Sequence, residues 1–286
     1  MTRRGVAIAA LVPAVLAIWG FAIEPAMLRV VERPVAVPGW AAGEPLRIAL
    51  LADLHVGSPW NGPDRLREVV RRTNAANPDL ILMLGDYVSH DIVGGRYVTP
   101  EAIDEIVHDL KSPLGVYAVL GNHDLALNGR RVAGALEIAG IRVLSDRAVR
   151  IAPGDGRHAA FWLAGVSDLQ RGPHDVRGTL AQVTDDAPVL LMTHNPDLFP
   201  EVPATVALTV AGHTHGGQVW IPFVGRPIVP SIYGGRYAAG LVVEEGRRVF
   251  VATGIGTSIL PVRFLVPPEI TLLVIERAPA APAVAR

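Results

Sequence analysis

The sequence contains no cysteine among its 286 residues, which excludes disulfide bonds, thiolate metal sites and cysteine nucleophiles. It also has no excess of one charge, because 26 lysines and arginines face 27 aspartates and glutamates. A general basic surface for nucleic acid is therefore not expected. Hydrophobic residues, in contrast, make up 50% of the chain, and many of them gather at the N-terminus.

An uncharged, mostly apolar run extends from Gly5 to Ile23, directly after Arg3 and Arg4. Its roughly 19 residues approach the length that an apolar helix needs to cross a bilayer. We therefore predict a single transmembrane helix within residues 1–24, with a cleaved export signal and a buried core helix as the alternatives. By the positive-inside rule, the remaining chain should lie outside the cytoplasmic membrane, in the periplasm or the extracellular space.

The rest of the chain divides into three parts by composition. Residues 25–45 are rich in proline and glycine and are expected to form a linker, with one edge strand at Val35–Val37. Residues 46–277 should form the main domain, and the Ala/Pro-rich tail 278–286 is expected to be disordered.

Short apolar runs alternate with helical spacing in the first half of this domain, and strands dominate the second half. Strands are expected at 46–52, 79–84, 115–120, 142–144, 160–165, 189–192, 207–211, 240–243, 249–253 and 270–275, and helices at 63–76, 100–110 and 130–139. This order predicts an α/β fold in which two mixed sheets pack face to face with helices outside.

Five short motifs follow or lie within these apolar runs, and each supplies oxygen or imidazole donors. They are Asp53-Leu54-His55, Gly85-Asp86, Gly121-Asn122-His123-Asp124, Thr193-His194-Asn195 and Gly212-His213-Thr214-His215. Because sites in open α/β sheets gather at the carboxyl ends of strands, the donors should converge on one edge. One motif alone is more often a turn than a site, but the ordered set predicts a binuclear metal centre.

The mixture of donors limits both the metal and the reaction. Imidazole with carboxylate suits manganese, iron, zinc or cobalt better than calcium or magnesium, which prefer oxygen alone. Two neighbouring ions need a bridging ligand such as Asp86, and a bridging hydroxide is the expected nucleophile in phosphate ester hydrolysis. His123 is a candidate proton donor to the leaving group, with Asp124 as its orienting partner.

In order and spacing, the motifs resemble those of the calcineurin-like metallophosphoesterases, over about residues 46–276. The resemblance implies a four-layer α/β/β/α sandwich and two divalent ions, with manganese favoured. It assigns one ion to Asp53, His55, Asp86 and His215, and the other to Asp86, Asn122, His194 and His213. It also makes His123 a general acid or a phosphate-binding histidine.

The stretches 212–218, 254–258, 261–264 and 267–271 resemble a small bacterial branch of this family that is linked to the inner membrane. Some of its members are phosphodiesterases, and some act on UDP-diacylglucosamine in lipid A synthesis. We therefore expect hydrolysis of a phosphodiester or pyrophosphate bond, with lipid-linked phosphate as one substrate class. The alternatives are a lipid A enzyme on the inner membrane face and a non-catalytic, metal-binding membrane scaffold.

Two further residues are candidates for substrate contacts. Asn195 directly follows His194, and Arg263 lies in the stretch 261–264. Asn195 has the alternative of a local cap, and Arg263 that of a surface arginine or one that bridges parts of the core.

Overall fold

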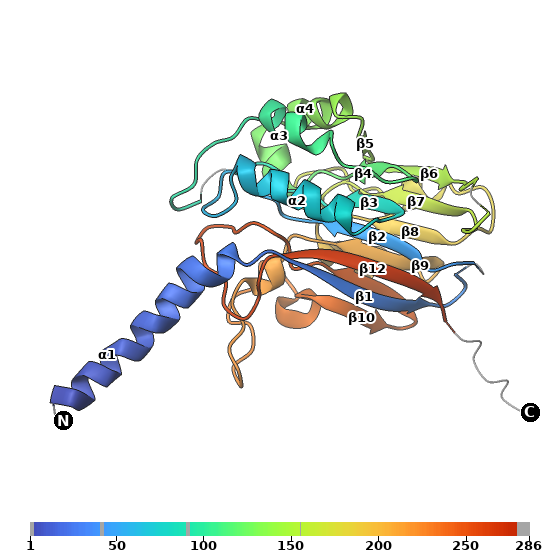
Figure 1. Ribbon diagram of the computed structural model, residues 1–286. Helices are drawn as coiled ribbons and strands as arrows, with labels where there is room; N and C mark the ends of the chain where they lie inside the picture. The colour runs from blue at the N-terminus through green and yellow to red at the C-terminus, as the bar shows by residue number, and fades with distance from the viewer. Residues whose placement is uncertain (1–2, 41–42, 90–91, 155, 279–286) are drawn as a thin grey trace, which may run out of the picture.

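The computed structural model describes residues 3–40, 43–89, 92–154 and 156–278 (Figure 1). Two six-stranded mixed sheets lie face to face. In spatial order, the first sheet contains β1 (Arg29–Val37), β12 (Glu269–Arg277), β2 (Leu46–Leu51), β3 (Leu80–Met83), β4 (Val116–Ala118) and β5 (Arg142–Val143). The second contains β10 (Gly240–Glu244), β11 (Arg247–Val251), β9 (Val206–Ala211), β8 (Val189–Met192), β7 (Phe161–Gly165) and β6 (Arg147–Ile151).

Parallel pairing runs through the middle of both sheets, from β2 through β3 and β4 to β5, and from β7 through β8 and β9 to β11. The carboxyl ends of these strands therefore lie on a common edge. Antiparallel neighbours flank the parallel strands, with β12 beside β2, β6 beside β7 and β10 beside β11. The prediction of two mixed sheets is confirmed.

Helices cover the outer face of each sheet. Three helices, α2 (Pro63–Ala75), α3 (Pro100–Val107) and α4 (Asn122–Ile138), lie over the first sheet. Helix α2 begins with Pro63 in its first turn and buries Leu66, Val69 and Val70 on one side, as helical spacing requires. The second sheet has a thinner cover, made of α5 (Val176–Leu180) and the 3-10 helices η3 (Pro196–Glu201) and η5 (Gly234–Tyr237).

The main core lies between the sheets. Ile48, Leu50, Leu82, Leu163 and Leu190 all point into it and have no exposed surface. Strands buried on both faces read as continuous apolar runs, which explains why they were recognisable in the sequence. Each fully buried leucine or isoleucine stabilises the fold by about 1.5–3 kcal/mol.

Three elements differ from the sequence-based expectations. Residues 29–37 of the predicted linker form β1, so the edge strand expected at Val35–Val37 is part of a longer strand that pairs along its whole length with β12. β6 was not predicted, and α4 begins at Asn122 rather than at residue 130, although a kink at Asn128 separates its first turns from the predicted segment. Pro34 explains the first difference, because a proline within an apolar run argues against a sheet strand, although edge strands such as β1 tolerate it.

The N-terminal segment is helical, with α1 (Arg3–Ile18), the π-helix η1 (Trp19–Ile23) and the 3-10 helix η2 (Glu24–Ala26) in succession. Helix α1 projects away from the body of the molecule (Figure 1). Among the helices in the described part of the chain, none is long and apolar enough to cross a membrane, so the predicted transmembrane helix is not confirmed. Nearly all of the predicted disordered tail, from residue 279, lies outside the described residues.

Candidate metal centre

The carboxyl ends of the central strands deliver all seven predicted ligands to one place. Asp53 and His55 follow β2, Asp86 follows β3, and Asn122 opens α4 shortly after β4. From the second sheet, His194 follows β8, and His213 and His215 follow β9. The structure thus assembles the centre from both sheets.

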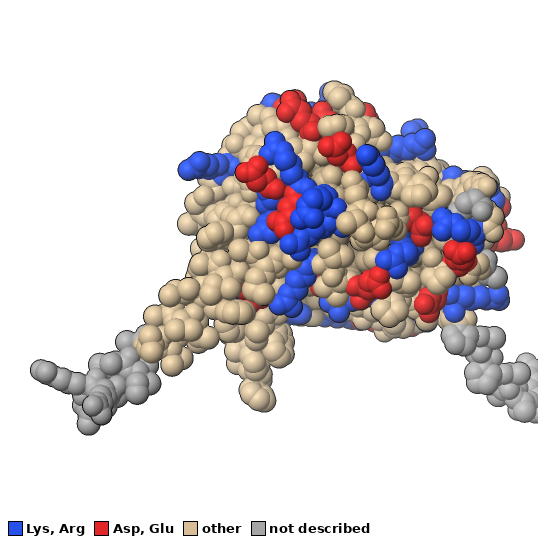
Figure 2. Space-filling model, in the orientation of Figure 1, with Lys and Arg blue, Asp and Glu red and all other residues tan. Residues whose placement is uncertain are grey.

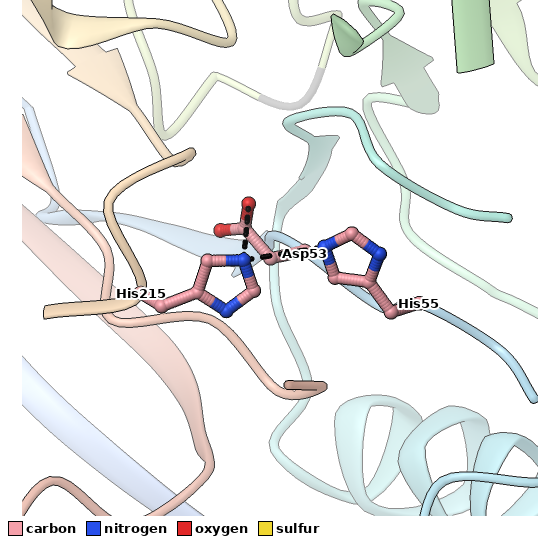
Figure 3. A group of neighbouring side chains, drawn as sticks. All are labelled: Asp53, His55 and His215. Carbon is pink, nitrogen blue, oxygen red and sulfur yellow. Dashed lines mark hydrogen bonds and ion pairs between the residues drawn. The ribbon is translucent and has the colours of Figure 1, made fainter. Parts of the chain in front are cut away.

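The first group of ligand atoms belongs to Asp53, His55 and His215, which converge in Figure 3. One donor atom from each lies within 4.8 Å of the other two. The Nε2 atoms of His55 and His215 face each other at 3.2 Å, and Asp53 Oδ1 lies 3.7 Å from His215 Nε2. All three side chains are buried.

The second group surrounds the Nε2 atom of His194. Asp86 Oδ2 lies 3.3 Å from it, Asn122 Oδ1 lies 3.1 Å away, and His213 Nδ1 lies 3.1 Å away. The other ring nitrogen, Nδ1 of His194, bonds the carbonyl of Leu84 at 2.8 Å. That bond fixes the tautomer and directs the Nε2 lone pair toward the group.

Asp86 joins the two groups through a single atom. Its Oδ2 lies 3.6 Å from His55 Nε2 in the first group and 3.3 Å from His194 Nε2 in the second. Its Oδ1 accepts a hydrogen bond from the backbone N–H of His123 at 2.9 Å. The carboxylate is therefore held in one orientation, with one oxygen between the two groups.

The donor set fits divalent cations. Lone pairs of imidazole and carboxylate converge in a buried space, where the Nε2 atoms of His55 and His215 face each other and the Oδ1 of Asp53. Because a metal–nitrogen bond is about 2 Å long, two nitrogens 3.2 Å apart can reach the same ion. Imidazole with carboxylate selects metals such as manganese, iron, zinc or cobalt.

Burial keeps most of the imidazoles neutral, which is the form that binds metal. It lowers the pKa of His55 to about 4 and that of His213 to about 3. For Asp86, burial alone would raise the pKa, but attraction to His194 and His55 outweighs it and holds the pKa well below its ordinary value. The shared ligand is therefore a carboxylate at neutral pH.

Five of the ligands occupy left-handed backbone conformations that side chains rarely adopt. Their φ angles are 52° at Asp53, 40° at His55, 56° at Asp86, 69° at His213 and 51° at His215. Each such conformation costs on the order of 1–3 kcal/mol and persists only where the surroundings enforce it. Here the bonds from Asp53 N to Gly85 O and from His55 N to Asp86 O, at 3.0 and 2.9 Å, provide that constraint.

Two glycines allow the ligand loops to pack this closely. A Cβ atom at Gly121 would collide with the Asp86 carboxylate, and one at Gly254 would lie 2.8 Å from the Asp53 Cβ. Gly254 also has a φ of +70°, which favours glycine. Side chains at these positions would displace the carboxylates of both groups.

Asp124 braces the backbone of the ligand loops. Its carboxylate accepts hydrogen bonds from the N–H groups of Asp86, Tyr87, Val88 and Gly121, at 2.8 to 3.2 Å. Four bonds use the four lone-pair sites of a carboxylate. The structure therefore gives Asp124 a different role from the predicted orientation of the His123 imidazole: it ties the loop after β3 to the start of α4.

The two predicted substrate contacts lie inside the fold. The fully buried guanidinium of Arg263 donates to the carbonyls of Thr253, Gly256 and Val266, so the predicted substrate contact of Arg263 is wrong and the core-bridging alternative holds. The Oδ1 of Asn195 accepts from Asp197 N at 2.9 Å and caps η3. Neither side chain lines the cavity above the ligands.

That cavity has a volume of about 390 Å³ and opens over both ligand groups. Its floor includes Asp86, Asn122, His213 and His215, and His123 lies in its wall with its ring edge against His55. The opposite wall contains Ser258, from the stretch 254–258, and residues that the sequence-based reasoning missed, namely Gln170, Ser231, Ile232 and Ile259. They lie in loops without periodic patterning, so the sequence carried no signal that would bring them to the site.

Comparison with known proteins shows the family to which the chain belongs. The chain is 31% identical to the uncharacterized metallophosphoesterase YkuE of Bacillus subtilis, over 90% of each chain. It is 32% identical to the phosphodiesterase YaeI of Escherichia coli, over 80% of this chain and 82% of YaeI. It is 26% identical to the UDP-2,3-diacylglucosamine pyrophosphatase LpxG of Chlamydia trachomatis, over 91% of this chain and 93% of LpxG. Residues 46–217, more than half of the chain, match the family described as calcineurin-like phosphoesterase. The chain therefore belongs to the calcineurin-like phosphoesterases and is a metallophosphoesterase.

Proposed function

We propose that the chain hydrolyses a phosphodiester or pyrophosphate bond with two divalent ions, of which manganese is the favoured metal. The observation that carries the proposal is the position of Asp86 Oδ2 between two buried groups of ligands. Asp53, His55, Asp86 and His215 would hold one ion, and Asp86, Asn122, His194 and His213 the other. Two such ions, when bound, lower the pKa of water to supply a nucleophile and offset the charge of the phosphate.

The chain's own residues supply the remaining steps. His123 lines the cavity beside both ligand groups, where its imidazole can donate a proton to the leaving oxygen. The backbone N–H of His123 is bonded to Asp86 Oδ1, so the acid and the shared ligand keep a fixed relative position. The Nε2 atom of Gln170 lies 3.4 Å from the Nε2 atom of His213 and helps to orient the His213 ring.

The names of the relatives favour a diester or a pyrophosphate over a monoester. YaeI is named a phosphodiesterase and LpxG a pyrophosphatase, and the chain aligns with most of both. A lipid A enzyme that cleaves a UDP-2,3-diacylglucosamine-type pyrophosphate is therefore the second candidate. Assays of a soluble diester and of this nucleotide-linked pyrophosphate on the same preparation would separate the two.

We also propose that the chain acts at a bacterial cytoplasmic membrane, with the catalytic domain on its outer side. The support is the apolar run that follows Arg3 and Arg4. A reporter that functions only in the periplasm, fused after residue 286, should be active. An active reporter that requires the cytoplasm would instead favour the inner face.

The decisive experiment compares three proteins loaded with manganese, with bis-p-nitrophenyl phosphate as substrate. Asp86→Asn keeps the size of the side chain but removes the charge shared by both groups. We expect turnover to fall by about 10³-fold or more, because the ions supply several kcal/mol of transition-state stabilisation. Bound manganese, measured by elemental analysis, should fall with it.

Asp64→Ala is the matched control, because the Asp64 side chain is fully exposed and pairs with Arg67 on α2. It should keep both manganese and turnover. Full activity of Asp86→Asn would contradict the two-metal proposal. An inactive wild-type protein that binds manganese would favour the metal-binding scaffold.

A further inference from the structure

Three segments expose large apolar side chains on one side of the molecule, the side from which α1 projects. They are residues 11–23 of α1 and η1, the loop 219–232, and the loop 259–265, and together they form what we call the apolar face. Phe223 at the tip of the second segment is fully exposed, and Ile228, Ile232 and Ile259 are each more than two-thirds exposed. In Figure 1 the orange loop and α1 project away from the same side of the body.

Hydrogen bonds tie the three segments into one surface. Gln218 joins the two loops, because its Nε2 donates to the carbonyls of Ser258 and Leu260 and its Oε1 accepts from Ser258 N. Trp220 N donates to Phe264 O at 2.9 Å, and Arg263 N donates to Gly20 O at 2.9 Å. The loops and the base of the N-terminal helix therefore hold fixed positions relative to one another.

The apolar face is almost free of charge. Residues 11–23 contain no charged side chain, and the two loops contain only Arg226 and Arg263. Both arginines turn inward: Arg226 bonds the carbonyl of Gly216, and Arg263 is fully buried. Figure 2 shows the same contrast, because the described part of the helical projection and the projecting loop carry no blue or red atoms, while the body above them carries many.

Three of the five tryptophans of the chain lie where these projections join the body. Trp19, Trp60 and Trp220 are each between one-third and one-half exposed. The Nε1 of Trp60 donates to Phe21 O at 2.9 Å, so Trp60 packs beside the base of the helix. Tryptophan between an apolar projection and a charged body is typical of the interface between lipid tails and headgroups.

We infer that the apolar face docks onto a lipid bilayer, with the tip of the loop 219–232 inserted among the lipids. A bilayer is the occupant that suits the shape, because the helix and the loop stand out as separate convex projections rather than line a groove. The tip is a tight turn closed by the Ile221–Gly225 bridge, which presents Phe223 and Val224 outward without packing them against the protein. Apolar projections with aromatic bases are the features that bind the plane of a membrane.

Docking in this way would place the active-site cavity at the lipid headgroups. Ile232 and Ile259 belong to the apolar face and also line the cavity above the ligands. Asp197 lies three residues after the ligand His194 in the sequence. Its carboxylate accepts hydrogen bonds from Ser231 Oγ at 2.5 Å and from Ile232 N at 2.8 Å, and these bonds fix the end of the loop 219–232. If the proposed hydrolysis is correct, on which this step rests, the substrate is a phosphoester carried by a lipid.

The absence of cysteine allows a direct test on the full-length chain, since one introduced cysteine gives one labelled position. Phe223→Cys and Ile228→Cys would carry an environment-sensitive fluorophore on the apolar face. Ile138→Cys is the matched control, because Ile138 is a similarly exposed isoleucine at the end of α4, on the opposite side of the molecule. Each protein is mixed with phosphatidylethanolamine–phosphatidylglycerol vesicles that contain a nitroxide-labelled lipid.

We expect the nitroxide lipid to remove about half or more of the emission from positions 223 and 228 and little from position 138, because interfacial docking buries apolar residues about 5–10 Å deep. Equal quenching at all three positions would overturn the inference. A blue shift of the emission at position 223 that occurs without vesicles and increases with protein concentration would also overturn the inference. It would show that a second copy of the chain covers the apolar face. Turnover of soluble bis-p-nitrophenyl phosphate is measured in parallel, so that a failure of the proposed hydrolysis is distinguished from a failure to dock.

Discussion

The two sheets contribute different donor atoms to the candidate metal centre. The loops of the first sheet supply Asp53, His55, Asp86 and Asn122, which are mostly oxygen ligands, whereas the second sheet supplies three imidazoles. Neither sheet completes a group by itself, since the first group needs His215 and the second group needs Asp86. The core between the sheets is therefore part of the site, because it sets the distance between the two halves of each group.

Among the variants that follow, the largest effect is expected from His123, an imidazole of the first-sheet loops that is not assigned to metal but lines the cavity. His123→Ala should lower kcat by about 10²–10⁴-fold, because it removes the proton donor but none of the seven ligands. Manganese content should stay unchanged. His108→Ala, at an exposed position after α3, is the control and should leave kcat unchanged. Loss of metal in His123→Ala would instead identify His123 as a metal ligand. The loops of the first sheet would then supply two imidazoles, those of His55 and His123.

A pair of core substitutions tests whether the interface between the sheets belongs to the site. Leu82→Ala opens the core between the sheets, and Leu66→Ala opens the core under α2; both leucines are fully buried. Each should lower the free energy of unfolding by about 2–5 kcal/mol. Only Leu82→Ala should also weaken manganese binding, because it alone alters the packing of one sheet on the other. Equal metal affinity in the two variants, measured by calorimetry, would show that each sheet holds its ligands independently.

A smaller effect is expected from the brace within the first-sheet loops. In the wild-type protein the two carboxylate oxygens of Asp124 accept four backbone N–H groups. Asp124→Asn leaves a single acceptor oxygen, so the loop after β3 should loosen. We expect manganese affinity to fall by about 10–100-fold, as for other groups that orient metal ligands. Asp175→Asn, at the exposed cap of α5 in the second half of the chain, should have no such effect. An unchanged affinity in Asp124→Asn would remove Asp124 from the site.

The elements that position the ligands were the ones most readily predicted from the sequence. β2, β3, β8 and β9 are buried along most of their length, so each reads as a mainly apolar run that leads to a donor; only Arg47 in β2 and Thr209 in β9 interrupt the pattern. β1 contains Pro34, and β6, at an edge of the second sheet, has arginines at two of its five positions, so neither shows that pattern. Edge strands obtain much of their stability from their neighbours, which local sequence does not reveal.

In the site, too, local sequence predicted some features, and others depend on tertiary structure. The ligand types and their order came from the motifs, and the assignment to two groups came from the family resemblance. The role of Asp124 was not predictable, because it depends on four backbone N–H groups whose directions are set by the fold. Arg263 looked like a phosphate contact for its charge alone, whereas its surroundings are buried carbonyls. The cavity wall comes from loops whose meeting depends on tertiary packing.

The left-handed backbone at five ligands has a consequence for how this chain changes under selection. Asp53, His55, Asp86, His213 and His215 each occupy a conformation that glycine would adopt with less cost. Replacing one of the three histidines with glycine should relieve local strain and make the metal-free protein harder to unfold. At Asp53 and Asp86 the gain is offset, because their carboxylates accept the backbone N–H groups of His213 and His123. Activity and stability therefore oppose each other at the three histidines. A descendant of this chain that no longer hydrolyses phosphate would be expected to lose these side chains early, and to gain stability as it does so.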